Sequence, residues 1–320
     1  MAAVFVPWAA GPQVGLFGKV PTAGDFAHLR IGDDQKLCDW LARGVERASA
    51  KLGSRWSTAF DGGAPFGFMM RQTSGSVLGG VMRPSRDTVG RRFPLAGYAS
   101  LSPTEMPNVR HLVPWALTAF AQSLCGLVSS AESVGMDPVE TIRNIAVQGV
   151  PGEQGVVQYV EWLRSTSAKA WFEAVWRRKD GELPKYAVAM VVSSVGQYAG
   201  QDNSQNPLAL RLPLAGDLRG AAFWIDLVAR LGAWKVTIPT VFWEALQPST
   251  VLIQLGEARP SSYVELWSRG SDDEHVVDLC SLGTVNSEPF LAAVPSALVQ
   301  KLGDDAASLW DVLSAAGAGA

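Results

Sequence analysis

The stretch GLFGKVPTAGDF, Gly15 to Phe26, combines glycines, a lysine and an aspartate in the manner of loops that bind phosphate. A P-loop also requires a glycine five residues before its Gly-Lys pair and a Ser or Thr directly after the lysine. Those positions hold Gln13 and Val20, so the hydroxyl that binds magnesium is missing. The stretch therefore favours a structural turn, in which Gly24 can adopt a positive φ and Asp25 accepts backbone hydrogen bonds.

A second dense stretch, GGVMRPSRDTVGRRFPL from Gly79 to Leu95, surrounds one acid, Asp87, with four arginines: Arg83, Arg86, Arg91 and Arg92. In one interpretation Asp87 pairs with one arginine and orders the loop. In the other, the arginines form a basic docking surface for a carboxylate- or phosphate-bearing segment of a partner protein.

The usual catalytic templates are incomplete. The sequence contains no HExxH, no GxSxG and no CxxC, and its three cysteines are far apart. Candidate acids and bases are Asp25, Asp61, Asp87, His28, His111 and His275. The three aspartates could converge on a metal, but an aspartate beside glycine is more often a turn former. We expect no catalytic residue, no metal and no cofactor.

The composition narrows the class of protein. The 320 residues are 48% hydrophobic and 18% charged, with a formal net charge of −3, which disfavours binding to nucleic acid. Apolar runs are too short to span a bilayer, and the segment MAAVFVPWAAGPQ lacks the basic start of a signal peptide. Unpaired cysteines suit a reducing compartment. A cytoplasmic protein without membrane insertion is expected.

Hydrophobic periodicity predicts the elements that must position these loops. The predicted strands cover residues 14–17, 66–72, 76–82, 93–101, 185–194, 208–214, 234–238 and 251–255. The predicted helices cover 35–52, 113–128, 137–149, 156–176 as one helix or two, 220–231, a short piece around 242–243, and 295–313. Pro94 predicts that its strand either lies at a sheet edge or begins there. The pattern indicates one α+β unit over residues 12–258 with a partly helical C-terminal extension, 259–320.

Together the two stretches resemble the TagF (ImpM) family of type VI secretion accessory proteins. The first motif, GxxGKxPxxGDF, is present as Gly15, Gly18, Lys19, Pro21, Gly24, Asp25 and Phe26. The second, GxxxPSxDxxGRxFPL, is present as Gly80, Pro84, Ser85, Asp87, Gly90, Arg91, Phe93, Pro94 and Leu95. The resemblance covers about residues 12–101, with a weaker echo at Phe223-Trp224, Ile238-Pro239 and Phe242.

The resemblance implies an α/β fold with a central, mostly antiparallel sheet flanked by helices, of which the longin-like fold is one form. It also implies a non-enzymatic, cytoplasmic protein that represses type VI secretion after translation by binding an Fha-type forkhead-associated scaffold protein, among other secretion components. The motif residues are the candidate partner-binding positions. Two alternatives stay open: an enzyme with an aspartate-lined site on the two glycine-rich loops, and a homodimeric scaffold protein.

Overall fold

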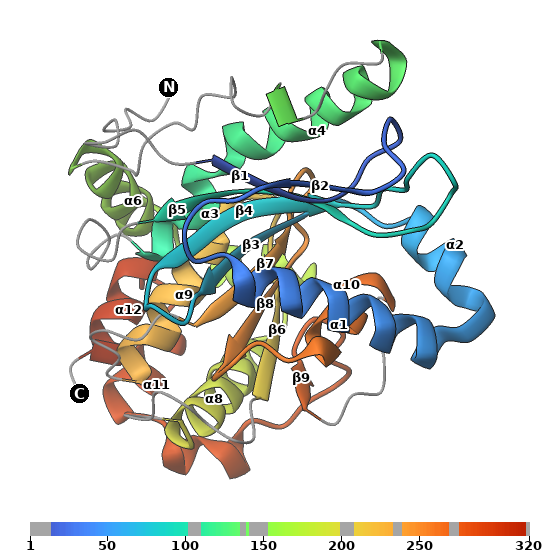
Figure 1. The fold of residues 1–320 in the computed structure, drawn as a ribbon. Helices are drawn as coiled ribbons and strands as arrows, with labels where there is room; N and C mark the ends of the chain where they lie inside the picture. Colours follow the sequence, from blue (N-terminus) through green and yellow to red (C-terminus); the bar gives the residue numbers. More distant parts are fainter. Residues whose placement is uncertain are drawn as a thin grey trace.

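The computed structural model describes residues 14–101, 110–134, 139–140, 153–198, 208–232, 239–268 and 275–317. In these residues the strands form one nine-stranded sheet in the order β2-β1-β5-β4-β3-β7-β8-β6-β9. Neighbouring strands run antiparallel except β6 and β9, which are parallel. The prediction of a mostly antiparallel sheet flanked by helices is confirmed (Figure 1).

The strands are β1 (Val14–Lys19), β2 (Phe26–Leu29), β3 (Phe66–Arg71), β4 (Val77–Arg83), β5 (Leu95–Leu101), β6 (Leu208–Pro213), β7 (Thr240–Glu244), β8 (Thr250–Leu255) and β9 (Val276–Asp278). The predicted hairpin of β3 and β4 is confirmed. β5 begins directly after Pro94 and lies between β1 and β4. Pro94 therefore marks the start of a strand rather than a sheet edge.

Each face of the sheet packs on its own hydrophobic core, because alternate side chains of a strand point to opposite faces. On β3, Met69 belongs to one core, whereas Phe68 and Met70 belong to the other. Helices α1 (Gln35–Leu52), α2 (Trp56–Asp61) and α10 (Pro260–Ser268) cover the second of these faces. Gly44 allows α1 to approach α10, since a Cβ there would lie 2.5 Å from the Tyr263 ring.

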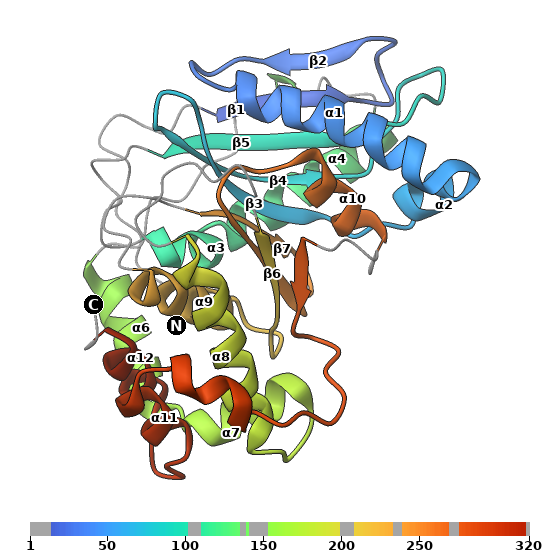
Figure 2. The ribbon, with the colours of Figure 1, turned by 90° about the horizontal axis from the view of Figure 1, so that it is seen from below.

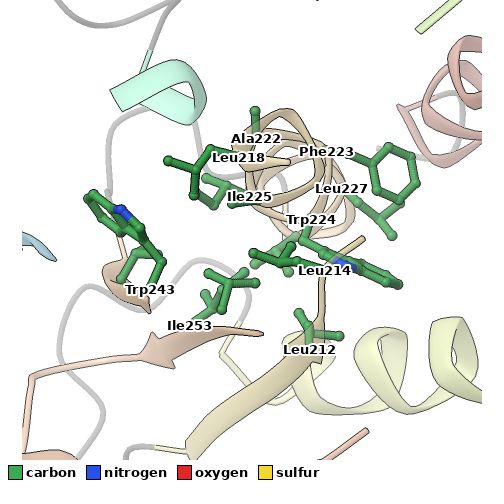
Figure 3. Close-up of a cluster of buried hydrophobic side chains, with 14 of the residues drawn as sticks. Leu212, Leu214, Leu218, Ala222, Phe223, Trp224, Ile225, Leu227, Trp243 and Ile253 are labelled. Carbon is green, nitrogen blue, oxygen red and sulfur yellow. The ribbon is translucent and has the colours of Figure 1, made fainter. Parts of the chain in front are cut away.

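The other face packs against a larger set of helices, most of which gather toward the β6–β8 end of the sheet (Figure 2). They are α3 (Val113–Ala116), α4 (Thr118–Val134), α6 (Glu153–Ser165), α7 (Ala168–Trp176), α8 (Glu182–Gly196), α9 (Leu218–Leu231), α11 (Ser296–Leu302) and α12 (Leu309–Gly317). Figure 3 shows α9 placing Leu218, Trp224 and Ile225 against the strands. Trp224 also donates its indole N–H to the Pro213 carbonyl at 3.0 Å. Helix α4 is the exception, because it packs on β4 and its Cys125 lies beside the second glycine-rich loop.

One strand prediction is wrong. Residues 185–194 lie within helix α8, not in a central strand. Buried side chains recur every four residues in this helix, at Ala187, Val191 and Val195. Other apolar residues between them hide this period in the sequence. Pro184 is tolerated because it lies in the first turn.

Other boundaries also differ from the predictions. Phe242 and Trp243 lie in strand β7 rather than a helical piece, because the sheet supplies partners on both sides of them. The predicted helix over 295–313 is two helices, α11 and α12, separated at Gly303, and the 156–176 prediction resolves into α6 and α7. The predicted strand 234–238 and most of the predicted helix 137–149 lie outside the described residues.

Residues beyond 259 contribute to the same fold. Helix α10 packs on α1, and Trp40 donates its indole N–H to the Arg259 carbonyl at 2.8 Å. Strand β9 pairs with β6, and α12 packs against α9. The proposed division of the chain at residue 258 stays a prediction.

Candidate functional site

The two glycine-rich stretches form adjacent loops, which we call the paired loops: residues 20–25 after β1 and residues 84–94 between β4 and β5. Pairing of β1 with β5 brings them together, with Gly18 opposite Leu95. The Thr88 amide donates to the Ala23 carbonyl at 3.1 Å, and the Arg91 guanidinium donates to the Gly24 carbonyl at 2.6 Å. Motifs more than sixty residues apart thus form one structural unit.

Asp87 lies at the centre of this unit, and its side chain is fully buried. One carboxylate oxygen accepts from the amides of Val89 and Arg91, at 3.1 and 2.8 Å. The other contacts the Lys19 ammonium at 3.0 Å and the Arg91 guanidinium at 2.7 Å. The predicted pairing of Asp87 with one arginine is confirmed, and Lys19 is a second, buried cation.

This arrangement sets the charge of Asp87. Burial alone raises the pKa of a carboxyl group. Here the backbone bond from Arg91 and the bonds from Lys19 and Arg91 outweigh burial and hold the pKa of Asp87 well below its ordinary value. At neutral pH Asp87 is therefore an ionised structural group, and both of its oxygens accept hydrogen bonds.

Aromatic rings close one side of the paired loops. The Lys19 ammonium lies 4.2 Å from the centre of the Phe26 ring, a cation–π contact. Phe93 meets Phe26 edge-on, with ring centres 4.9 Å apart, and Phe26 stacks on Phe17. Phe26, the first residue of β2, nevertheless stays 43% exposed, so an aromatic ring faces solvent directly beside the paired loops.

The backbone of the loops depends on two glycines. Gly18 has φ +145°, and a Cβ there would lie 2.0 Å from the Pro94 carbonyl oxygen, whereas Gly90 has φ +87°. Gly24, for which a positive φ was predicted, does not adopt one. A Cβ at Gly24 would meet the Thr88 hydroxyl at an ordinary van der Waals distance of 3.5 Å, so sterics do not require a glycine there. Pro21 lies in the turn between Gly18 and Gly24.

The three aspartates do not converge on one point. Asp25 is exposed and accepts from the neighbouring Phe26 amide at 2.8 Å. Asp61 pairs with Arg92 through two bonds of 2.9 and 2.7 Å, which lower its pKa. Asp87 pairs with Lys19 and Arg91. Each acid has its own structural partner, which removes the geometric basis for an aspartate metal site on these loops.

The remaining arginines of the second loop line a cavity of about 370 Å³. Arg83 donates to the carbonyls of Pro84 and Cys125 at 3.4 Å, whereas Arg86 is exposed. Ser85 lines the same cavity, and its buried hydroxyl has no hydrogen-bond partner among the described residues. The exposed side chain of Leu246 adds an apolar wall. Because Asp61 also lines the cavity, its lining carries both charges and suits a polar group better than a hydrophobic one.

A different set of residues does converge, and sequence reasoning missed it. His28, Asp34 and Cys38 place one donor atom each within 4.8 Å of one another. Burial, reinforced by the charge of Asp34, raises the pKa of the Cys38 thiol to about 12. By itself the thiol is therefore a weak nucleophile. The signal in the sequence was a His-x5-Asp-x3-Cys spacing that matches no familiar metal motif.

Within the parts of the chain that the structure covers, none of the helices combines the length and the apolar character that crossing a bilayer demands.

Residues 15–146 match the model of the TagF N-terminal domain, which is type VI secretion system-associated. The match includes both paired loops and confirms the resemblance drawn from their motifs. The fold is also similar to the crystal structure of PA0076 from Pseudomonas aeruginosa PAO1, with 16% sequence identity, a TM-score of 0.44, and coverage of 86% of this chain and 100% of that one. No curated protein matches the sequence.

Proposed function

We propose that this chain is a non-enzymatic, cytoplasmic regulator that represses assembly of a bacterial type VI secretion system by binding an Fha-type forkhead-associated scaffold protein. The observation that carries the proposal is the TagF N-terminal domain over residues 15–146. The occupied state of Asp87 supports the non-enzymatic part, because a carboxylate saturated by two cations and two amides has no capacity left for general acid–base work.

The surface proposed to bind the scaffold protein is the outer side of the paired loops. It presents two large apolar side chains, Phe26 at 43% and Val89 at 74% exposure. The second loop also carries two exposed arginines, Arg86 and Arg91. Exposed apolar residues next to arginines are typical of protein interfaces, and arginine binds carboxylates in a bidentate manner. The expected partner segment therefore carries both apolar and acidic side chains.

Co-purification with the cognate scaffold protein tests the pathway. The wild-type chain should retain the scaffold protein, a deletion strain should over-assemble the secretion system, and an overexpressing strain should assemble less. Normal secretion in both strains would contradict the proposal.

Charge and shape variants test the surface. Val89→Glu and Arg86→Glu should each weaken binding roughly tenfold, or about 1.4 kcal/mol, without changing the fold. Val157→Glu is the matched control, because Val157 is also exposed but lies on α6. Arg47→Glu on α1 serves the same purpose for the arginine. If the controls weaken binding as much as the loop variants, another surface binds the partner.

A further inference from the structure

The cluster of His28, Asp34 and Cys38 lies where β2 passes to α1. His28 comes from β2, Asp34 immediately precedes α1, and Cys38 lies in the first turn of that helix. The first helical bond, from the Cys38 amide to the Asp34 carbonyl at 3.1 Å, places these two side chains on the same side of the helix start. Asp34 and Cys38 are buried, whereas the His28 side chain is 23% exposed.

The distances within the cluster are too long for good hydrogen bonds. The Nε2 atom of His28 lies 3.6 Å from the Asp34 Oδ2 atom and 4.0 Å from the Cys38 Sγ atom. An N–H···O bond spans about 2.7–3.2 Å. Neighbouring donor atoms around a tetrahedral zinc ion, with bonds of about 2.0–2.3 Å, lie about 3.3–3.6 Å apart. The His28–Asp34 separation matches a loaded zinc site, whereas the His28–Cys38 separation is longer and the three atoms lie within 4.8 Å of one another, so the cluster would contract on binding a metal.

The geometry also separates a metal site from a catalytic relay. In a Cys-His-Asp relay the thiol and the carboxylate contact different ring nitrogens of the histidine. Here the same nitrogen, Nε2, faces both partners. Three donor atoms that face one common point suit a cation, not proton transfer through a ring.

An outer layer of contacts orients the carboxylate. The Tyr98 hydroxyl donates to Asp34 Oδ2 at 2.8 Å, and the Ile31 amide donates to the same oxygen at 3.3 Å. Tyr98 fits because residue 15 is a glycine, at which a Cβ would lie 2.3 Å from the tyrosine ring. The edge of the Phe17 ring supports the imidazole of His28, with ring centres 5.0 Å apart. Such second contacts are typical of residues that hold a metal ligand in place.

We propose that His28, Asp34 and Cys38 bind a zinc ion, with a fourth coordination position open toward the exposed side of His28. A thiolate, an imidazole and a carboxylate form a donor set suited to zinc, whereas magnesium and calcium take oxygen ligands. The metal displaces the thiol proton on binding. Bound there, it links β2 to the start of α1 and leaves one position for water or for a side chain of a partner.

Cobalt(II) substitution tests the site on the purified, chelator-treated full-length chain. Cobalt bound to a thiolate gives a charge-transfer absorption band, so titration should produce this band and saturate at one ion per chain. Cys38→Ser should abolish the band. Cys125→Ser and Cys280→Ser are matched controls that should retain it, since neither residue belongs to the cluster.

The partly exposed side chain of His28 provides a second variant in case the first one does not fold. If Cys38→Ser does not fold by circular dichroism, His28→Gln provides the same test, because its side chain reaches solvent. Zinc should raise the unfolding midpoint of the wild-type chain and leave that of His28→Gln unchanged. The proposal is overturned if the folded wild-type chain shows no thiolate band, or if the band survives Cys38→Ser, or if zinc stabilises both chains equally.

Discussion

Two buried aspartates lie near opposite ends of the β1–β2 pair, and they differ in how their charge is balanced. Asp87 contacts two cations and two backbone amides within 3.2 Å. Asp34 is equally buried but accepts from one hydroxyl and one amide, and its nearest histidine nitrogen is 3.6 Å away. The charge of Asp87 is balanced by two cations at short range, whereas Asp34 has two neutral donors and a more distant histidine nitrogen.

The difference separates an aspartate that holds two segments together from one that is a candidate metal ligand. A saturated, buried ion pair holds two segments together, and removing one partner leaves an uncompensated charge. A buried carboxylate with incomplete compensation costs free energy unless something else completes it. The motif that looked most like a phosphate loop is thus the structural one. The cluster without a familiar motif is the better candidate for a bound ion.

Asp87→Asn should give the largest effect on stability in this comparison. The substitution removes the charge that holds Lys19 and Arg91, while keeping the shape of the side chain. We expect the largest fall in the midpoint of thermal unfolding at neutral pH among the variants considered in this comparison. Circular dichroism of the variant and the wild type provides the measurement.

The pH dependence of Asp87 follows from its lowered pKa. Its carboxyl group is more acidic in the folded chain than its ordinary value of 3.8. It therefore stabilises the fold fully above that pH, and this contribution is lost progressively as the pH falls from there through the lower pKa of the folded state. The stability gap between wild type and Asp87→Asn should narrow between neutral pH and about pH 3. A gap that stays constant would show that shape, not charge, explains the loss.

Gly18→Ala should give the next largest effect. The new Cβ would have to occupy space now taken by the Pro94 carbonyl, in a backbone conformation that alanine rarely adopts. Such overpacking and strain cost roughly 3 kcal/mol. Urea unfolding provides the free energy. Gly283→Ala is the control, since nothing lies within 4 Å of a Cβ at Gly283 and its φ is not positive; an equal loss there would refute the steric explanation.

Asp34→Asn should cost less, about 1 kcal/mol without metal, because an amide oxygen can still accept from Tyr98. Urea unfolding in the presence of a chelator isolates this value. If Asp34→Asn lowers the free energy of unfolding more than Asp87→Asn does, Asp87 is not the more important of the two buried acids for stability.

Asp25→Ala should have the smallest effect, within about 0.5 kcal/mol. Asp25 is exposed and accepts only from the adjacent Phe26 amide among the bonds that the structure records for it. The same urea experiment measures it. A loss as large as that of Gly18→Ala would mean that the turn, and not the buried pair, holds the paired loops.

Local sequence patterns predicted much of the fold. They also predicted that Asp87 pairs with an arginine, but not that it contacts Lys19. Helix α1 begins and ends where its apolar period predicted, and β1, β3, β4, β6 and β8 follow their alternating or apolar runs closely. Asp87 lay among arginines in the sequence, so pairing with one of them could be predicted. Helix α8 could not be predicted from the sequence, because a continuous apolar run fits a buried strand and a buried helix equally well.

The sequence by itself determined the elements with a clear period, the turn at Pro21, and the two motifs that indicate the TagF N-terminal domain. Only the tertiary structure decided which residues share a site. Lys19 meets Asp87 because β1 and β5 are neighbours in the sheet, and Asp34 meets Tyr98 for the same reason. Strand pairing across more than sixty residues leaves no local trace in the sequence, so contacts that depend on it appear only once the sheet is assembled.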